Sequence, residues 1–149
     1  FLVVALARRL QRPREEASWP VYARKPLSPP EQQLYQRLTR AFPNHIILSQ
    51  VALPAMVGVK KGHDFRTWNN RFNRLYADFV ICERDFRVAA VIELDDRSHD
   101  HPRRQDADAR KAAALAAAGI PLHRLNVNPL PDVSDLQQLI APQAQLTGS

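Results

Sequence analysis

Two hydrophobic runs separated by a short polar stretch stand in the middle of the chain. Residues 78–82 (DFVIC) and 88–95 (VAAVIELD) flank a polar turn at 83–87. This pattern predicts an antiparallel hairpin. If the turn is centred in that stretch, Asp78 lies opposite Glu93 with both side chains on the same face of the sheet. A slip of one residue would separate the two carboxylates.

The patterning on either side of this hairpin completes an order α-β-β-β-α-β with a last short helix. Ser28-Pro29-Pro30-Glu31 has the form of a helix start, with Ser28 as the N-cap and Glu31 in the capping-box position. The other predicted elements are a first strand at 45–53, an alanine-rich helix formed by Pro102 and the run 106–118 and ended by Gly119, a fourth strand at 120–127, and a helix from Asp132 to 140.

The long stretch between the first strand and the hairpin mixes basic and aromatic residues. It contains Lys60, Lys61, Arg66, Arg71 and Arg74 among Phe65, Trp68 and Phe72. Basic side chains pair with phosphates and aromatic rings stack on bases, so the stretch is a candidate nucleic-acid-binding segment. The alternative is a structured insertion whose aromatic residues belong to the core and whose arginines are merely solvated.

Size and charge limit the classes of protein. The chain has 149 residues, of which 45% are hydrophobic, which suffices for one domain with a core. The net charge is +6 and the pI is about 10.1, whereas the end of the hairpin is acidic. A basic body around an acidic pocket suits a polyanionic substrate. The alternatives are a basic protein that is simply soluble and one that lies against an anionic membrane.

Cys82 is the sole cysteine. An internal disulfide is therefore excluded, and a reducing compartment is the simpler assumption. Cys82 lies inside an apolar strand, where we expect it to be buried and inert. A zinc site needs several cysteine or histidine ligands at close spacing, and this sequence does not provide them.

The two ends of the chain differ from the middle. Residues 1–10 begin with seven apolar residues followed by Arg8 and Arg9, as at the end of a membrane helix with a positive flank, although about 20 apolar residues are needed to span a bilayer. Under that interpretation the domain is cytoplasmic and tethered to the inner face of the membrane. The alternative is an amphipathic helix that packs on the domain. We expect a linker at 11–27, the domain at 28–140 and a disordered tail at 141–149.

The acidic residues of the hairpin are candidates for a metal site. Alternation along the second strand points Val91, Glu93 and Asp95 to one face, so that Asp78, Glu93 and Asp95 converge. Unpaired like charges are costly on a sheet, and a divalent cation removes that cost. Carboxylate oxygens suit Mg²⁺ or Mn²⁺. The alternative is a strand end that reaches solvent, where acidic residues keep the edge soluble.

The order of elements and the acidic motif together resemble the PD-(D/E)XK restriction-endonuclease-like nucleases, and in particular a branch of unknown function near the very-short-patch-repair endonucleases. The resemblance covers about residues 28–127. It implies an α/β fold with a restriction-endonuclease-like core, in which helices flank a mixed central sheet. The matching pieces are 29–31 (PPE), 77–80 (ADFV), 91–96 (VIELDD), 98–100 (SHD) and 118–124 (AGIPLHR).

The resemblance implies metal ligands. Asp78 and Glu93 would bind the metal ion, with the Leu94 carbonyl as a third ligand. Asp95 is a departure, because the motif has a lysine there that orients or activates the attacking water. Glu31 would reach the same pocket from the first helix, as in some relatives. The alternative for Glu31 is that it only closes its capping box.

The resemblance also implies how the missing lysine is replaced. His99 corresponds to a catalytic histidine of the patch-repair relatives and would act as the base or position the water. Arg104, Arg110 and Lys111 on the next helix would supply positive charge to the transition state. The alternatives are an idle imidazole, an Asp106–Arg110 pair four residues apart on the helix, and a solvated face.

From these residues we expect a metal-dependent nuclease that hydrolyses phosphodiester bonds in nucleic acid with Mg²⁺ or Mn²⁺. A second hypothesis is a catalytically degenerate domain that keeps the fold and binds nucleic acid or serves as a scaffold. A structural role is the third: Asp95 and Asp96 would bind arginines of the alanine-rich helix and tie the strand to it.

Overall fold

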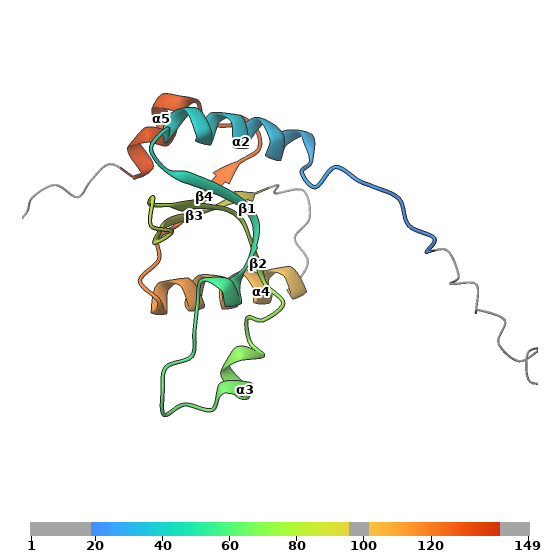
Figure 1. Ribbon diagram of the computed structural model, residues 1–149, viewed down its shortest axis with the longest axis vertical. Coiled ribbons are helices and arrows are strands. Elements are labelled where there is room, and N and C mark those ends of the chain that lie inside the picture. Colours follow the sequence, from blue (N-terminus) through green and yellow to red (C-terminus); the bar gives the residue numbers. More distant parts are fainter. Residues whose placement is uncertain (1–18, 96–101, 141–149) are drawn as a thin grey trace, which may run out of the picture.

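A computed structural model describes residues 19–95 and 102–140, which form a four-stranded sheet with helices on both faces (Figure 1). The strands are ordered β1-β2-β3-β4 across the sheet. Along the chain the elements are α2 (Pro29–Ala41), β1 (Ile46–Ala52), the 3-10 helix η1 (Leu53–Ala55), α3 (Phe65–Asn69), β2 (Tyr76–Cys82), β3 (Val88–Asp95), α4 (Pro102–Ala117), β4 (Leu122–Asn126) and α5 (Val133–Leu139).

The sheet is mixed. β1, β2 and β3 are antiparallel neighbours, whereas β4 pairs with β3 in parallel after the crossover through α4. The hairpin has the predicted register, because Phe79 pairs with Ile92 and Val80 with Val91. The predicted α/β class and mixed sheet are therefore confirmed. The η1 and α3 helices are additions within a stretch predicted as a connection.

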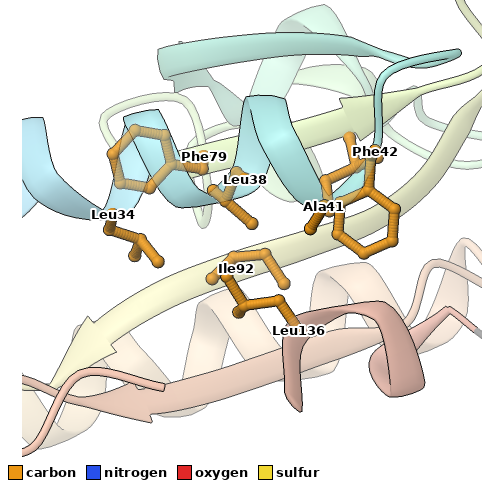
Figure 2. Close-up of a cluster of buried hydrophobic side chains, with 8 residues drawn as sticks. Leu34, Leu38, Ala41, Phe42, Phe79, Ile92 and Leu136 are labelled. Carbon is orange, nitrogen blue, oxygen red and sulfur yellow. The ribbon is translucent and has the colours of Figure 1, made fainter. Parts of the chain in front are cut away.

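One face of the sheet is covered by α2 and α5. Leu34 and Leu38 of α2 and Phe42, the C-cap of α2, meet Phe79 of β2 and other buried side chains from the sheet and α5 (Figure 2). Leu34 and Leu38 are fully buried, as expected for residues four apart on one helical face. Burial of each such side chain contributes about 2 kcal/mol of folding free energy.

The other face packs against α4. Its core contains Leu115 of α4, Leu53 of η1, and Val80 and Val91 of the hairpin, all buried. Phe72 reaches this core from the stretch before β2. Cys82 is a free, buried cysteine here, as predicted. Alternation along β2 and β3 thus gives each face its own apolar layer.

The helix ends follow the predicted chemistry. Ser28 is the N-cap of α2, and its backbone N–H and hydroxyl both donate to Glu31 Oε2 at 2.6 Å. Asp132 caps α5 by accepting from Asp135 N–H at 3.0 Å. Gly119 follows α4 with φ of +71°, a conformation that favours glycine.

The predictions for the two ends of the chain fall on undescribed residues, namely 1–18 and 141–149. Residues 19–27 carry no helix or strand. Within the described ranges, no helix combines the length and the apolar character required to cross a membrane.

Candidate active site

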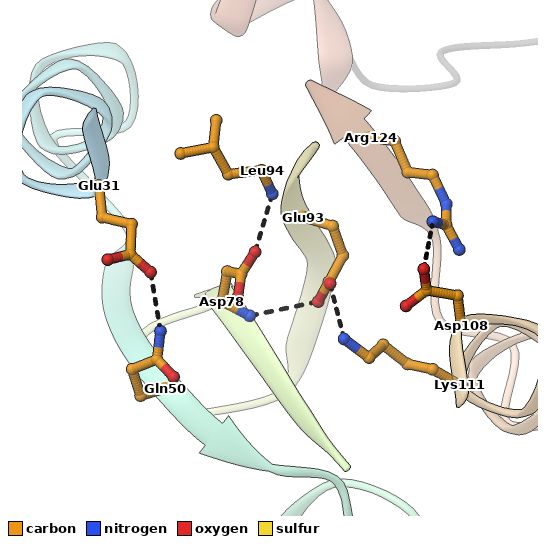
Figure 3. A network of polar contacts seen from close by, with 8 residues as sticks. All are labelled: Glu31, Gln50, Asp78, Glu93, Leu94, Asp108, Lys111 and Arg124. Carbon is orange, nitrogen blue, oxygen red and sulfur yellow. Dashed lines mark hydrogen bonds and ion pairs between the residues drawn. The ribbon is translucent and has the colours of Figure 1, made fainter. Parts of the chain in front are cut away.

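A row of polar side chains runs across all four strands at one level of the sheet. Gln50 of β1 stands between the pairs Ser49–Phe79 and Val51–Ala77, which sets it opposite Asp78 of β2. The hairpin register sets Asp78 opposite Glu93 of β3, and Glu93 pairs with Arg124 of β4. The strands therefore align four polar residues without help from any loop (Figure 3).

Asp78 and Glu93 are linked by hydrogen bonds between the side chain of each residue and the backbone of the other's strand. The backbone N–H of Asp78 donates to Glu93 Oε1 at 3.2 Å, and the backbone N–H of Leu94 donates to Asp78 Oδ2 at 2.8 Å. Each carboxylate thus accepts a hydrogen bond from the neighbouring strand. These bonds fix the directions of both side chains (Figure 3).

Lys111 brings a positive charge to this pair from α4. Its Nζ lies 2.6 Å from Glu93 Oε2, and only 8% of the residue is exposed. Glu93 and Lys111 are the sole charged residues classed as buried in the described part of the chain. The suggestion that Lys111 lies on a solvated face is therefore wrong. Asp95 follows Glu93 by two residues on β3, and the lysine beside the acidic pair comes from α4.

Burial dominates the electrostatics of the two carboxylates. Desolvation raises the pKa of Asp78, and the charges of Glu31 and Asp108 raise it further. Desolvation also raises the pKa of Glu93, with a second contribution from the charge of Asp78. Lys111 acts in the opposite direction on both pKa values. Proximity between two carboxylates disfavours their joint ionisation.

Glu31 serves two purposes. Its Oε2 closes the capping box, as one alternative held, while its Oε1 accepts from Gln50 Nε2 at 3.0 Å. The charge of Glu31 also reaches Asp78. The predicted approach of Glu31 to the acidic pair and its capping role are therefore compatible.

Gln50 has an uncommon backbone conformation, with φ of +53°. A side chain with a Cβ disfavours this left-handed region by about 1 kcal/mol. Such residues are often found where function requires a particular geometry. Here the conformation places Gln50 beside Asp78 in the row and lets its amide reach Glu31 (Figure 3).

A second ion pair lies at the β4 end of the row. Arg124 Nη1 is 3.7 Å from Asp108 Oδ2 of α4. Asp108 and Lys111 are three residues apart and share one helical face. The network in Figure 3 thus combines four carboxylates with two cations, an excess of negative charge on a chain of net charge +6.

Other predicted site residues lie elsewhere. His99 and Asp96 fall outside the described residues. Asp95 is half-buried, and no ion pair joins it to α4 within the described ranges. The proposed tie between Asp95 and an arginine is thus not found; Glu93 and Lys111 make the strand-to-helix contact.

The other two predicted cations of α4 are exposed. Arg110 pairs with Asp106 at 3.1 Å, as the alternative held, and its Nη1 donates to the Arg71 carbonyl at 3.1 Å. Arg110 is therefore directed away from Glu93. Arg104 lies seven residues before Lys111, which places it on the same side of α4, two turns nearer the helix start.

A group of three or more His, Cys, Asp or Glu side chains arranged to hold a metal ion is not present among residues 19–95 and 102–140. Asp78 and Glu93 are the two adjacent carboxylates that the sheet itself brings together. Oxygen donors of this kind are those that Mg²⁺ and Mn²⁺ prefer.

The family assignment rests on residues 23–143, which match the model of a family described as a protein of unknown function, DUF2726. The chain belongs to the DUF2726 family. The match includes every element from α2 to α5, and with them the whole polar row. Neither a curated protein nor a solved structure matches this DUF2726 chain significantly.

Sequence reasoning missed three members of the network in this DUF2726 domain: Gln50, Asp108 and Arg124. Gln50 had no local signal, because it comes opposite Asp78 through the pairing of β1 with β2 across a long connection. Asp108 had a signal, since it is three residues from Lys111 on the helix. Arg124 depends on the parallel register of β4, which no local pattern specifies.

Proposed function

We propose that this domain is a metal-dependent nuclease that hydrolyses phosphodiester bonds in nucleic acid. The observation that carries the proposal is the buried contact of Lys111 Nζ with Glu93 Oε2 beside Asp78. An acidic pair with an adjacent lysine is the set of groups that the nuclease resemblance requires, although the lysine comes from α4 and not from β3.

The topology supports a restriction-endonuclease-like core. Helix α2 precedes three antiparallel strands, and α4 then connects β3 to a parallel β4. That is the order expected from the resemblance. The acidic pair lies near the end of β3 and the start of β2, at one end of the two central strands of the sheet.

The residues fit a hard divalent cation. Mg²⁺ is commonly held by one or two carboxylates together with waters and substrate phosphate, so Asp78 and Glu93 suffice as protein ligands. Burial raises the pKa of both groups and their proximity adds to the effect on Glu93. A cation would relieve this repulsion. The Leu94 carbonyl is the proposed third ligand.

When bound, Mg²⁺ or Mn²⁺ supplies Lewis-acid polarisation of a phosphoryl oxygen and acidifies a bound water. The protein's own groups hold and orient the side chains of the site. Lys111 keeps Glu93 in place and gives the site a positive charge near the phosphate. Asp78 is held by the Leu94 N–H. Glu31 fixes Gln50 at the border of the site. We assign proton transfer to His99 or Asp95.

A degenerate binding domain or scaffold is the second candidate. The observation in its favour is the same ion pair, since Lys111 already neutralises Glu93 and joins α4 to β3 without a metal. Under this hypothesis the pair is structural. The two candidates differ in whether metal and cleavage depend on Asp78.

We also propose that the domain works in the cytoplasm, because the free thiol of Cys82 suits a reducing compartment. Attachment to the membrane through residues 1–10 belongs to the same proposal.

The test is cleavage of plasmid DNA, single-stranded DNA and RNA with Mg²⁺ or Mn²⁺, with and without a chelator. We expect metal-dependent cleavage that falls at least about a hundredfold in Glu93→Gln, as for loss of a principal transition-state contact. Asp85→Asn, in the exposed hairpin turn, is the matched control and should retain activity. Cleavage that is absent, or equal in Glu93→Gln, would contradict the proposal, and binding without cleavage would favour the degenerate domain.

A further inference from the structure

The segment of residues 60–74, which we call the basic arm, projects from the body on the side of α4 (Figure 1). Contacts with the body of the domain hold this segment where it leaves and rejoins the body. Leu53 N–H donates to the Leu75 carbonyl at 2.9 Å, which joins the two ends of the excursion. Phe72 is 7% exposed and packs in the α4-side core. The arm is therefore a built part of the fold and not a loose connection.

The surface of the arm is strongly positive. Asp64 is its single acidic residue, and the Asp64 carboxylate caps α3 by accepting from Thr67 N–H at 2.7 Å. A dense positive surface of this type recognises a polyanion. The five basic residues are all exposed: Lys60, Lys61, Arg66, Arg71 and Arg74.

Two aromatic side chains are exposed on the same segment. Phe65 is 64% exposed and Trp68 is 44% exposed. They are three residues apart on α3 and are therefore neighbours on its surface. Phe72 belongs to the core, so the alternative of buried aromatics holds for that residue alone. Solvation of the arginines does not explain why two aromatic rings are exposed among them.

The indole of Trp68 is held by its neighbours. The Arg71 guanidinium carbon lies 4.4 Å from the ring centroid, and the His63 ring stands edge-on to it with centroids 6.4 Å apart. A cation over one face restricts the ring. An oriented and partly exposed ring of this kind is a platform on which a planar group can stack.

The arm is joined to the candidate active site through consecutive residues of α4. Arg110 donates to the Arg71 carbonyl at 3.1 Å, and Lys111 contacts Glu93 at 2.6 Å. One helical segment therefore holds both the arm and the acidic site. A polymer bound on the arm would be kept close to α4 and to the groups that α4 positions.

We propose that the basic arm binds an unpaired stretch of nucleic acid, with bases stacked on Trp68 and Phe65 and phosphates paired with the surrounding cations. Bases in a duplex are already stacked on each other, whereas unpaired bases can accept aromatic side chains. As a statement about substrate choice this inference rests on the proposed nuclease function: the acidic site would act on single strands or on unpaired regions of a duplex.

The test measures binding in the presence of a chelator, so that it does not depend on cleavage. Trp19 and Trp68 are the two tryptophans of the chain, so a Trp19→Phe background leaves Trp68 as the sole reporter. Titration with an oligo-dT strand should quench Trp68 fluorescence. A duplex of equal length should bind at least about tenfold more weakly, since its bases are already stacked on each other and cannot stack on Trp68.

Substitutions separate stacking from charge. In the full chain, followed by the anisotropy of a labelled strand, Trp68→Ala and Phe65→Ala should each weaken binding about tenfold, and Trp68→Phe should restore most of it. Phe86→Ala is the matched control, because Phe86 is 63% exposed on the hairpin turn, and it should bind like wild type. Lys60→Ala with Lys61→Ala should reduce the salt dependence.

Equal affinity for duplex and single strand, or unchanged affinity in Trp68→Ala and Phe65→Ala, would overturn the proposal. Preferential single-strand binding in a protein that does not cleave would support the arm and contradict the nuclease function. Cleavage with no dependence on the arm residues would support the nuclease and contradict the arm. The two proposals therefore fail separately.

Discussion

The two faces of the sheet are built differently although they share the same strands. Under α2 and α5, buried side chains such as Leu38 and Phe79 form a wholly apolar layer (Figure 2). Under α4, Leu115 and Val91 are apolar, but the buried Glu93 and Lys111 follow at the end of β3 (Figure 3). Burying an ion pair is a poor way to gain stability. Both faces contribute apolar core, but among the described residues the buried charges lie only on the second face, where we propose the active site.

Removal of a large apolar side chain from the first face should have the largest effect on stability. Leu38→Ala should lower the free energy of unfolding by about 4 kcal/mol, because it leaves a cavity beneath fully buried neighbours. Urea denaturation measures the loss. The affinity of the folded variant for metal and for single strands should equal that of wild type. A loss below about 1 kcal/mol would show that this face does not carry the fold.

Removal of one charge from the second face should cost less. Lys111→Met leaves Glu93 buried without a cation and should lower the unfolding free energy by about 3 kcal/mol at about pH 8. The double variant Glu93→Gln, Lys111→Met should recover most of that loss, as a double-mutant cycle in urea would show. If the single and double variants were equally stable, the two side chains would not be coupled.

The pH dependence of stability should distinguish the site from the surface. Folding raises the pKa of Asp78, so its contribution is present below the carboxyl's usual pKa and is lost as pH rises through the raised value. Asp78→Asn should therefore become less destabilising as pH rises, in urea denaturation with a chelator. The amide oxygen of the introduced asparagine can still accept the hydrogen bond from Leu94 N–H.

Asp132→Asn is the control for that series and has the opposite sign. Hydrogen bonds from Asp135 N–H and the Ser134 hydroxyl lower the pKa of Asp132, so its contribution is present above the usual carboxyl pKa and is lost as pH falls. The cost of Asp132→Asn should grow as pH rises. Parallel trends in the two variants would contradict the assignment of Asp78 as a desolvated carboxylate.

The smallest effect on stability is expected at Gln50. Gln50→Gly relieves the positive φ but loses the bond to Glu31, so unfolding free energy should change by no more than about 1 kcal/mol. Cleavage should nonetheless fall. Phe86→Gly is the control, because Phe86 also has positive φ, at +65°, but lies in the hairpin turn. Equal cleavage in both variants would remove Gln50 from the site.

The hairpin register was predictable from Phe79 to Ile81, beyond which the pairing shifts at Cys82. Hydrophobic runs of alternating pattern around a short polar turn restrict the register, and the register places Asp78 opposite Glu93. The capping box of α2 and the glycine after α4 were equally local and were predicted. Local rules therefore gave the acidic pair and the ends of the helices.

The remaining features of the site depend on packing between distant elements. Lys111 was expected as a cation, but its contact with Glu93 arises from the way α4 lies on the sheet. Arg124 enters the row through the parallel pairing of β3 and β4. The division of the aromatic residues between core and surface also depends on packing, since Phe72 turns inward while Phe65 and Trp68 remain exposed.

We propose that Asp78 and Glu93 form a site for a divalent cation. Titration of Mn²⁺ into the full chain, with free Mn²⁺ followed by electron paramagnetic resonance, tests this proposal. We predict one site in wild type and in the control Asp85→Asn, and loss of that site in Asp78→Asn. Equal Mn²⁺ binding by wild type and Asp78→Asn would contradict the proposal.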